Sequence, residues 1–191
     1  MNGSVQQKSL SREFLTNLTI EKILEVLLLI IAGALAIVIH ARLRTPLNIP
    51  GHHGIEFMAI ILGARLSSQI KWASSISALG IGLFILFPIL GFKDPMMGLN
   101  YMLPCFALDL AYNYLPLVKY RNILLSLGAG LSYMMIPLSR VIITLTTGYP
   151  YSSFIKHGFF TPFVSFLIFG FLGGALGTGF YHIGKKLLNK V

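Results

Sequence analysis

The sequence is short of charged residues, and above all of acidic ones. Only 11% of its 191 residues are charged, and 15 Lys and Arg residues outnumber six Asp and Glu residues. Because 55% of the residues are hydrophobic and the mean hydropathy is +0.77, the composition excludes an ordinary soluble domain. A chain of this length has room for one membrane domain and for no sizeable soluble domain beside it.

The motifs that would identify an enzyme are also missing. Without a P-loop the chain cannot hydrolyse ATP by that route, and no Gly-x-Ser-x-Gly, His-Glu-x-x-His or paired acidic motif supports hydrolysis. The single cysteine, Cys105, allows no internal disulfide and is expected to be inert packing in an apolar stretch. We therefore expect no cofactor, no cleaved signal peptide and no enzyme activity of the chain by itself.

Six apolar stretches divide the chain, and all but the second are long enough to cross a bilayer. The second has roughly 12 apolar residues, which give about 18 Å of helix against a hydrocarbon core of about 30 Å. We predict an all-α integral membrane protein with six transmembrane helices, the second of them short. The expected helices cover 23–41, 54–66, 72–90, 97–117, 123–145 and 158–183. The expected domains are an N-terminal tail over 1–20, a membrane domain over 21–187 and a C-terminal end over 188–191.

The positive charges orient these predicted helices. If all six cross, ten Lys and Arg residues fall on one side, four on the other and one inside the membrane. If the second stretch were re-entrant, the better orientation would give nine against five, which fits less well. Because basic loops stay in the cytoplasm, we predict a multi-pass protein of the cell membrane with both termini cytoplasmic. The basic residues cluster at helix ends, which indicates contact with lipid headgroups rather than nucleic acid.

Two charged residues lie inside the predicted membrane helices. A carboxylate there costs at least a few kcal/mol unless it is paired or faces water. With six crossings, Asp109 lies roughly 16 Å and Arg140 roughly 9 Å below the outer surface. Two interpretations stay open: an outward-open polar pocket in which Arg140 binds a ligand carboxylate or phosphate, or a structural Asp–Arg pair between helices. Tyr101 and Tyr133, on the outer sides of these two residues, are placed either to stack on a flat ligand or to anchor at the interface.

The second predicted helix begins with the polar segment Gly51-His-His-Gly-Ile-Glu56. His53 and Glu56 are three residues apart and share one face of a helix. The segment fits a ligand-facing loop, an interfacial cap, or a metal site formed by His and carboxylate, with His40 and His157 as further ligands if the fold gathers them.

A layout of several features resembles one transporter family. Ala32 and Ala36 lie on one face of the first helix, which is followed by a proline-containing loop and a short helix ending Leu62-Gly-Ala-Arg65. The last helix is rich in glycine and closes on lysines. Over about 23–186 this layout resembles the substrate-binding S components of energy-coupling factor (ECF) transporters. The segments Pro46-Leu-Asn-Ile-Pro50 and Leu62-Gly-Ala-Arg65 are nearest the biotin-binding branch. The sequence departs from that branch at His52-His53 and in a reduced glycine-rich stretch before the fourth helix.

The resemblance implies a small six-helix binder that captures a vitamin or metal ion from outside. It also implies partners, namely a transmembrane coupling subunit driven by two ATPases, with Ala32 and Ala36 as the docking face. The expected function is a membrane-embedded substrate-binding subunit for uptake of a small, vitamin-like nutrient. Its expected ligand-binding residues are Arg140, Asp109, Tyr101, Tyr133, His53 and Glu56. Two alternatives stay open: a small intramembrane metal-dependent enzyme using His52, His53 and Glu56, and an assembly subunit without a ligand.

Overall fold

Every regular element in the described part of the chain is a helix, as predicted. The computed structural model describes residues 3–43, 48–87, 91, 94, 96–115 and 121–189, with the backbone alone over 3–18. Pro46 and Leu47 of the predicted outer loop lie outside these residues. The helices are α1 (Gly3–Arg42), α2 (Gly54–Ser67), α3 (Ala73–Ile85), α4 (Met97–Tyr114), α6 (Asn122–Tyr133), α7 (Met135–Thr147), α8 (Ser152–His157) and α9 (Phe160–Leu188).

Three segments of the described chain are long and apolar enough to cross a membrane. They are Thr19–Arg42 in α1, Asn122–Thr147 across α6 and α7, and Phe160–Leu188 in α9. Many large apolar side chains on these helices are exposed, among them Leu28 at 65% and Phe180 at 65%. Such surfaces are rare on soluble monomers and match a lipid environment, so the fold is that of an all-α membrane protein.

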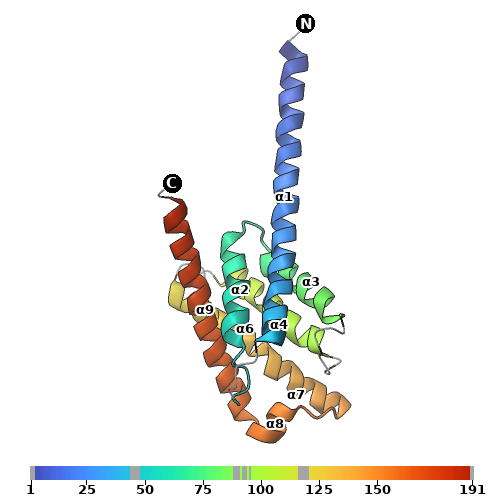
Figure 1. The fold of residues 1–191 in the computed structure, drawn as a ribbon, viewed down its shortest axis with the longest axis vertical. Coiled ribbons are helices and arrows are strands. Elements are labelled where there is room, and N and C mark those ends of the chain that lie inside the picture. The colour runs from blue at the N-terminus through green and yellow to red at the C-terminus, as the bar shows by residue number, and fades with distance from the viewer. Residues whose placement is uncertain are drawn as a thin grey trace.

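The bundle has two distinct ends (Figure 1). The N-terminus and the C-terminus lie at one end, here named the terminal end, and α8 lies at the other, the α8 end. α2 packs along α9, while α1 packs on α3. α2 runs for 14 residues, about 21 Å of helix, which confirms that the second helix is short.

The fifth predicted helix is broken, which the sequence prediction missed. α6 ends at Tyr133 and α7 begins at Met135, with a turn at Met134 between them. Pro137 explains the break, because it has no N–H for the carbonyl of Tyr133 and its ring crowds that carbonyl. The short helix α8 was not predicted either, and it lies between the fifth and sixth predicted helices. At helix ends, α3 stops at Ile85 rather than near 90, and α1 continues into the predicted tail as far as Gly3.

Glycines allow the helices of the bundle to approach closely, as expected from the glycine-rich sixth stretch. A Cβ added to Gly173 of α9 would lie 2.5 Å from the carbonyl oxygens of Gly54 and Ile55 in α2. A Cβ added to Gly80 of α3 would collide with the Ile30 carbonyl of α1. The first contact holds α2 against α9, and the second holds α3 against α1. The α2–α9 contact positions the residues at the start of α2.

Candidate ligand site at the α8 end

Side chains from several helices gather around the start of α2. They come from the end of α1, the turn before α2, the first turn of α2, and α4, α6 and α7. Together they form the polar cluster: His40, His52, His53, Glu56, Tyr101, Tyr133 and Arg140. Five of the six ligand-binding residues predicted from the sequence are members, and Asp109 is the exception.

The histidines and Glu56 form one side of the polar cluster. His53 Nδ1 lies 2.6 Å from Glu56 Oε1, and both side chains are 19% exposed, so the predicted shared face is confirmed. The His53 ring lies 3.9 Å from that of His52 and 4.8 Å from that of His40, centroid to centroid. His52 Nδ1 donates to the carbonyl of Ile49 at 2.7 Å, whereas its buried Nε2 has no described hydrogen-bond partner.

The two tyrosines form the buried floor of the cluster. Tyr101 Oη lies 2.8 Å from His40 Nε2. Tyr133 is fully buried and stacks on Phe166, with ring centroids 4.8 Å apart and an interplanar angle of 22°. Gly54 makes room for this ring, because a Cβ there would collide with it. The Tyr133 hydroxyl makes no hydrogen bond of good geometry among the described residues, although the Tyr101 hydroxyl lies close enough to interact with it.

Arg140 lies beside these rings and is not paired with an acid. Its guanidinium carbon is 5.3 Å from the centroid of Tyr151 and 5.9 Å from that of Phe166. It is close enough to Tyr101 and Tyr133 to interact with both electrostatically. Within the described residues no ion pair joins Arg140 to a carboxylate, and its buried Nε has no hydrogen-bond partner. Arg140 interacts with the Tyr101 hydroxyl but lacks a carboxylate partner among the described residues, so its guanidinium can bind an anion.

A chain of hydrogen-bonded polar groups that includes the Asp94 carboxylate borders Arg140, and the sequence analysis missed it. Ser139 Oγ donates to Asn100 Oδ1 at 2.7 Å, and Asn100 Nδ2 donates to Asp94 Oδ2 at 3.3 Å and Tyr151 Oη at 3.4 Å. The sequence signal that could have predicted it is Asn100, a polar residue between Leu99 and Tyr101, which is fully buried in the structure. These contacts tie α4 and α7 to Tyr151, which covers one side of Arg140.

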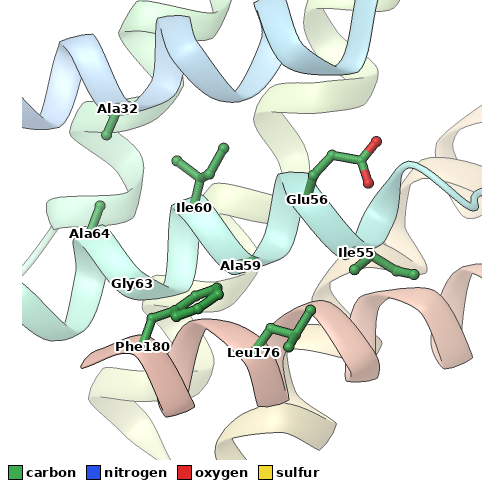
Figure 2. A pocket seen from close by; sticks show the side chains of 9 residues that line it. All are labelled: Ala32, Ile55, Glu56, Ala59, Ile60, Gly63, Ala64, Leu176 and Phe180. Atoms are coloured by element: carbon green, nitrogen blue, oxygen red, sulfur yellow. The ribbon is translucent and has the colours of Figure 1, made fainter. Parts of the chain in front are cut away.

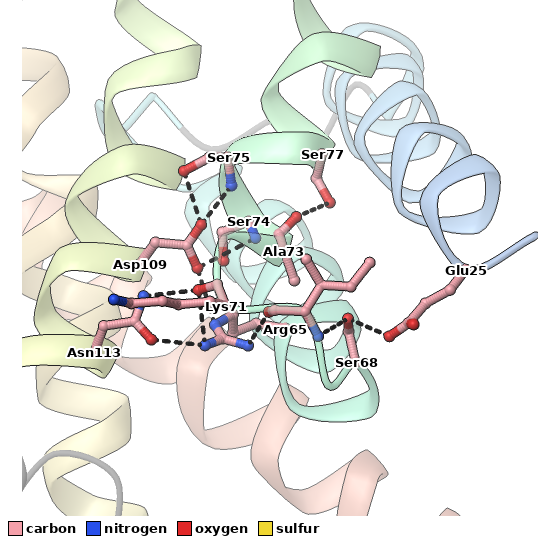
Figure 3. Close-up of polar contacts among 11 residues, drawn as sticks. Glu25, Arg65, Ser68, Lys71, Ala73, Ser74, Ser75, Ser77, Asp109 and Asn113 are labelled. Atoms are coloured by element: carbon pink, nitrogen blue, oxygen red, sulfur yellow. Dashed lines mark hydrogen bonds and ion pairs between the residues drawn. The ribbon is translucent and has the colours of Figure 1, made fainter. Parts of the chain in front are cut away.

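Asp109 lies elsewhere, beside Arg65 in the last turn of α2 and the first residues of α3 (Figure 3). Its Oδ1 is 2.9 Å from Arg65 Nε, with the two side chains 0% and 4% exposed. Ser75 donates to Oδ2 from its backbone N at 2.7 Å and its Oγ at 2.8 Å, and Ser74 N donates to Oδ1 at 3.3 Å. The considered pairing of Asp109 with Arg140 is thus wrong, because Arg65 is the partner. Along α4, Asp109 is about 12 Å from Tyr101.

Arg65, which the sequence analysis counted among the ten basic residues of the inner side, is the centre of a structural network. Its Nη1 donates to the Ile70 carbonyl at 3.1 Å, and its Nη2 donates to the Lys71 carbonyl and Asn113 Oδ1, both at 3.2 Å. The guanidinium also stacks over the Tyr112 ring at 4.0 Å. Together with Asp109, these contacts join α2, α4 and the start of α3.

The predicted docking pair, Ala32 and Ala36, does not form an exposed face. Ala36 is completely buried in the core, on the side of α1 that packs inside the bundle. Ala32 is half-buried and lines a groove with α2 and α9. An incoming subunit could therefore touch Ala32 but not Ala36 in this arrangement.

The comparisons with known proteins leave the site to be interpreted from its own chemistry. No family model, curated protein or solved structure matches the chain. Within the part of the chain that the structure describes, no three His, Cys, Asp or Glu side chains are grouped as a metal site requires.

Proposed function

We propose that the chain is a membrane-embedded binding protein for a small anionic nutrient, which it binds in the polar cluster. The observation that carries this proposal is the set of buried polar atoms without partners: Arg140 Nε, Tyr133 Oη and His52 Nε2. A buried polar group without a hydrogen bond costs about 1–3 kcal/mol. A ligand that supplies the missing partners removes this cost and gains affinity from it.

The charges of the polar cluster favour an anion. His53 Nδ1 donates to the Glu56 carboxylate at 2.6 Å, so Glu56 is bonded to His53 rather than to Arg140. Arg140 makes no ion pair among the described residues, so its guanidinium is the group that can bind an anion. A guanidinium binds carboxylate or phosphate in a two-pronged arrangement. The stacked rings of Tyr133 and Phe166 support a flat ligand beside it.

The proposed topology places this site outside the cell. With six crossings and cytoplasmic termini, the α8 end faces outward and receives the nutrient there. The chain has no ATPase motif, so uptake requires partners. In keeping with the layout that resembles ECF S components, these are a transmembrane coupling subunit and two ATPases, and biotin is one candidate ligand.

The Tyr133→Phe variant tests the proposed site through a hydroxyl that makes no hydrogen bond of good geometry within the protein. We expect its melting temperature to fall less than that of Tyr101→Phe, because the Tyr133 hydroxyl interacts only weakly, with that of Tyr101. We expect the variant to retain about 3- to 10-fold less of the small molecule that co-purifies in detergent, since about 1 kcal/mol of binding is lost. Mass spectrometry of the extracted small molecules gives the amount per protein.

Tyr101→Phe is the matched control. Its hydroxyl is hydrogen-bonded to His40. Removing it should lower the free energy of unfolding by about 1–3 kcal/mol, and the melting temperature should fall accordingly. If Tyr133→Phe is destabilised in the same way and retains as much small molecule as the wild type, then the Tyr133 hydroxyl serves the fold and not a ligand.

A further inference from the structure

A continuous groove follows the line where α2 and α9 pack. Its middle part has a volume of about 520 Å³ and its part at the terminal end about 540 Å³, and the two share Gly63 and Phe180. In Figure 2, Leu176 and Phe180 of α9 point toward α2, with Glu56 at the opposite end of the row from Phe180. These two adjoining volumes form the α2–α9 groove.

The two parts of the groove differ in chemistry. The middle part is lined by apolar side chains, including Ala59, Ile60, Ala64 and Leu176. From Ile55 to Ala64, the α2 residues that line this part rise about 14 Å, close to the roughly 15 Å thickness of one hydrocarbon leaflet. Glu56 is at the far end and is already bonded to His53. The middle part therefore fits an acyl chain in length and polarity.

The end of the groove near the termini adds polar groups and a positive charge to an apolar lining. Its polar residues are Ser67, Gln69, Tyr181, Lys185 and Asn189, and they stand beside Phe180 and Leu188. Lys185 lies over the Tyr181 ring at 6.0 Å and makes no ion pair within the described residues. The nearby acid Glu25 accepts hydrogen bonds from Ser68 Oγ and Gln69 N and does not line the groove. Lys185 is thus available to a phosphate group.

Because an apolar middle part leads to an end that carries Lys185, we infer that the α2–α9 groove is a binding site for an anionic phospholipid of the leaflet at the terminal end. The phosphate lies at Lys185 among the hydroxyl and amide groups, and one acyl chain lies along the apolar middle part toward Glu56. Basic pockets between membrane helices bind anionic headgroups in this way. The inference does not depend on a nutrient site in the polar cluster, which lies at the other end and shares only Glu56 with the lining of the groove.

Native mass spectrometry of the full chain in mild detergent, with equal amounts of phosphatidylglycerol and phosphatidylcholine, tests this site. We expect the wild type to retain phosphatidylglycerol preferentially. Lys185→Gln should reduce that retention about fivefold, because one lysine contributes about 1 kcal/mol. Lys186→Gln is the matched control, since it removes the same charge one residue away, outside the lining of the groove. Equal effects of the two variants would show general surface attraction and overturn the proposal.

Gly63→Leu tests the acyl-chain part of the groove. A Cβ at Gly63 fits, because its nearest neighbour outside its own helix is the Gly177 carbonyl oxygen at 4.0 Å. We expect the leucine to fill the groove and to lower retention of both lipids at an unchanged melting temperature. Wild-type lipid retention by this variant contradicts the proposal. A wild-type dimer that the Gly63→Leu substitution abolishes would also contradict the proposal, because a second copy of the chain would then occupy the groove.

Discussion

Arg140→Ala is expected to remove most of the bound small molecule from the purified protein. Removing one partner of a buried, hydrogen-bonded charge pair typically costs 2–5 kcal/mol or more. This corresponds to an affinity loss of about 30-fold to several thousand-fold. The effect should be specific to binding, because Arg140 makes no ion pair within the described chain that its loss would break. The measurement is the amount of co-purified compound per protein, with the melting temperature as a check on folding.

Two further arginine variants make this test sharper. Arg140→Lys keeps the charge but not the planar fork, so it should retain an intermediate amount of compound. Arg121→Ala removes an exposed arginine just before α6 and should retain the wild-type amount. An Arg140→Ala protein with wild-type ligand content would show that Arg140 does not bind the ligand.

Asp109→Asn is expected to give the largest loss of stability in the chain. The substitution keeps the shape of the side chain but leaves the Arg65 guanidinium buried, at 4% exposure, without its counter-charge. Breaking a buried ion pair by removing one partner costs about 3–5 kcal/mol. For a protein of this size the melting temperature should fall by about 6–20 °C. Thermal melting in detergent measures the change.

The double variant Arg65→Met with Asp109→Leu separates a structural role from a binding role. Replacing both charges by apolar groups of similar volume is often neutral, so we expect most of the lost stability to return. Ligand retention should match the wild type, because the pair lies about 12 Å along α4 from Tyr101. A stable Asp109→Asn protein that has lost its ligand would instead place Asp109 in the binding site.

Local patterns explain why much of the fold could be predicted from the sequence. The starts of α2 at Gly54 and of α4 at Met97 match the predicted residues, because each follows a turn rich in Gly or Pro and opens an apolar stretch. The break at Met134 is also a local effect, since Pro137 four residues after Tyr133 is visible in the sequence. It was missed because the apolar stretch continues through it.

The candidate site was predictable only where its contacts are local. His53 and Glu56 are three residues apart, so their contact follows from helix geometry. The partner of Asp109 depends on packing, because Arg65 lies 44 residues away and its side chain turns into the bundle rather than toward a basic rim. The burial of Ala36 is equally non-local, since α2 and α3 decide which face of α1 is covered.

Cysteine labelling of intact cells tests the central claim, that the polar cluster is a ligand site open to the outside. In a Cys105→Ala background, Ile49→Cys places a thiol beside the cluster, at an exposed residue whose carbonyl accepts from His52, and Ser67→Cys places one at the other end of α2. With a membrane-impermeant maleimide we expect Ile49→Cys to react on intact cells, and the co-purifying compound to slow that reaction. Ser67→Cys should react only after permeabilisation. Two results would contradict this account: labelling of Ser67→Cys but not Ile49→Cys on intact cells, or an Ile49→Cys reaction that the compound leaves unchanged.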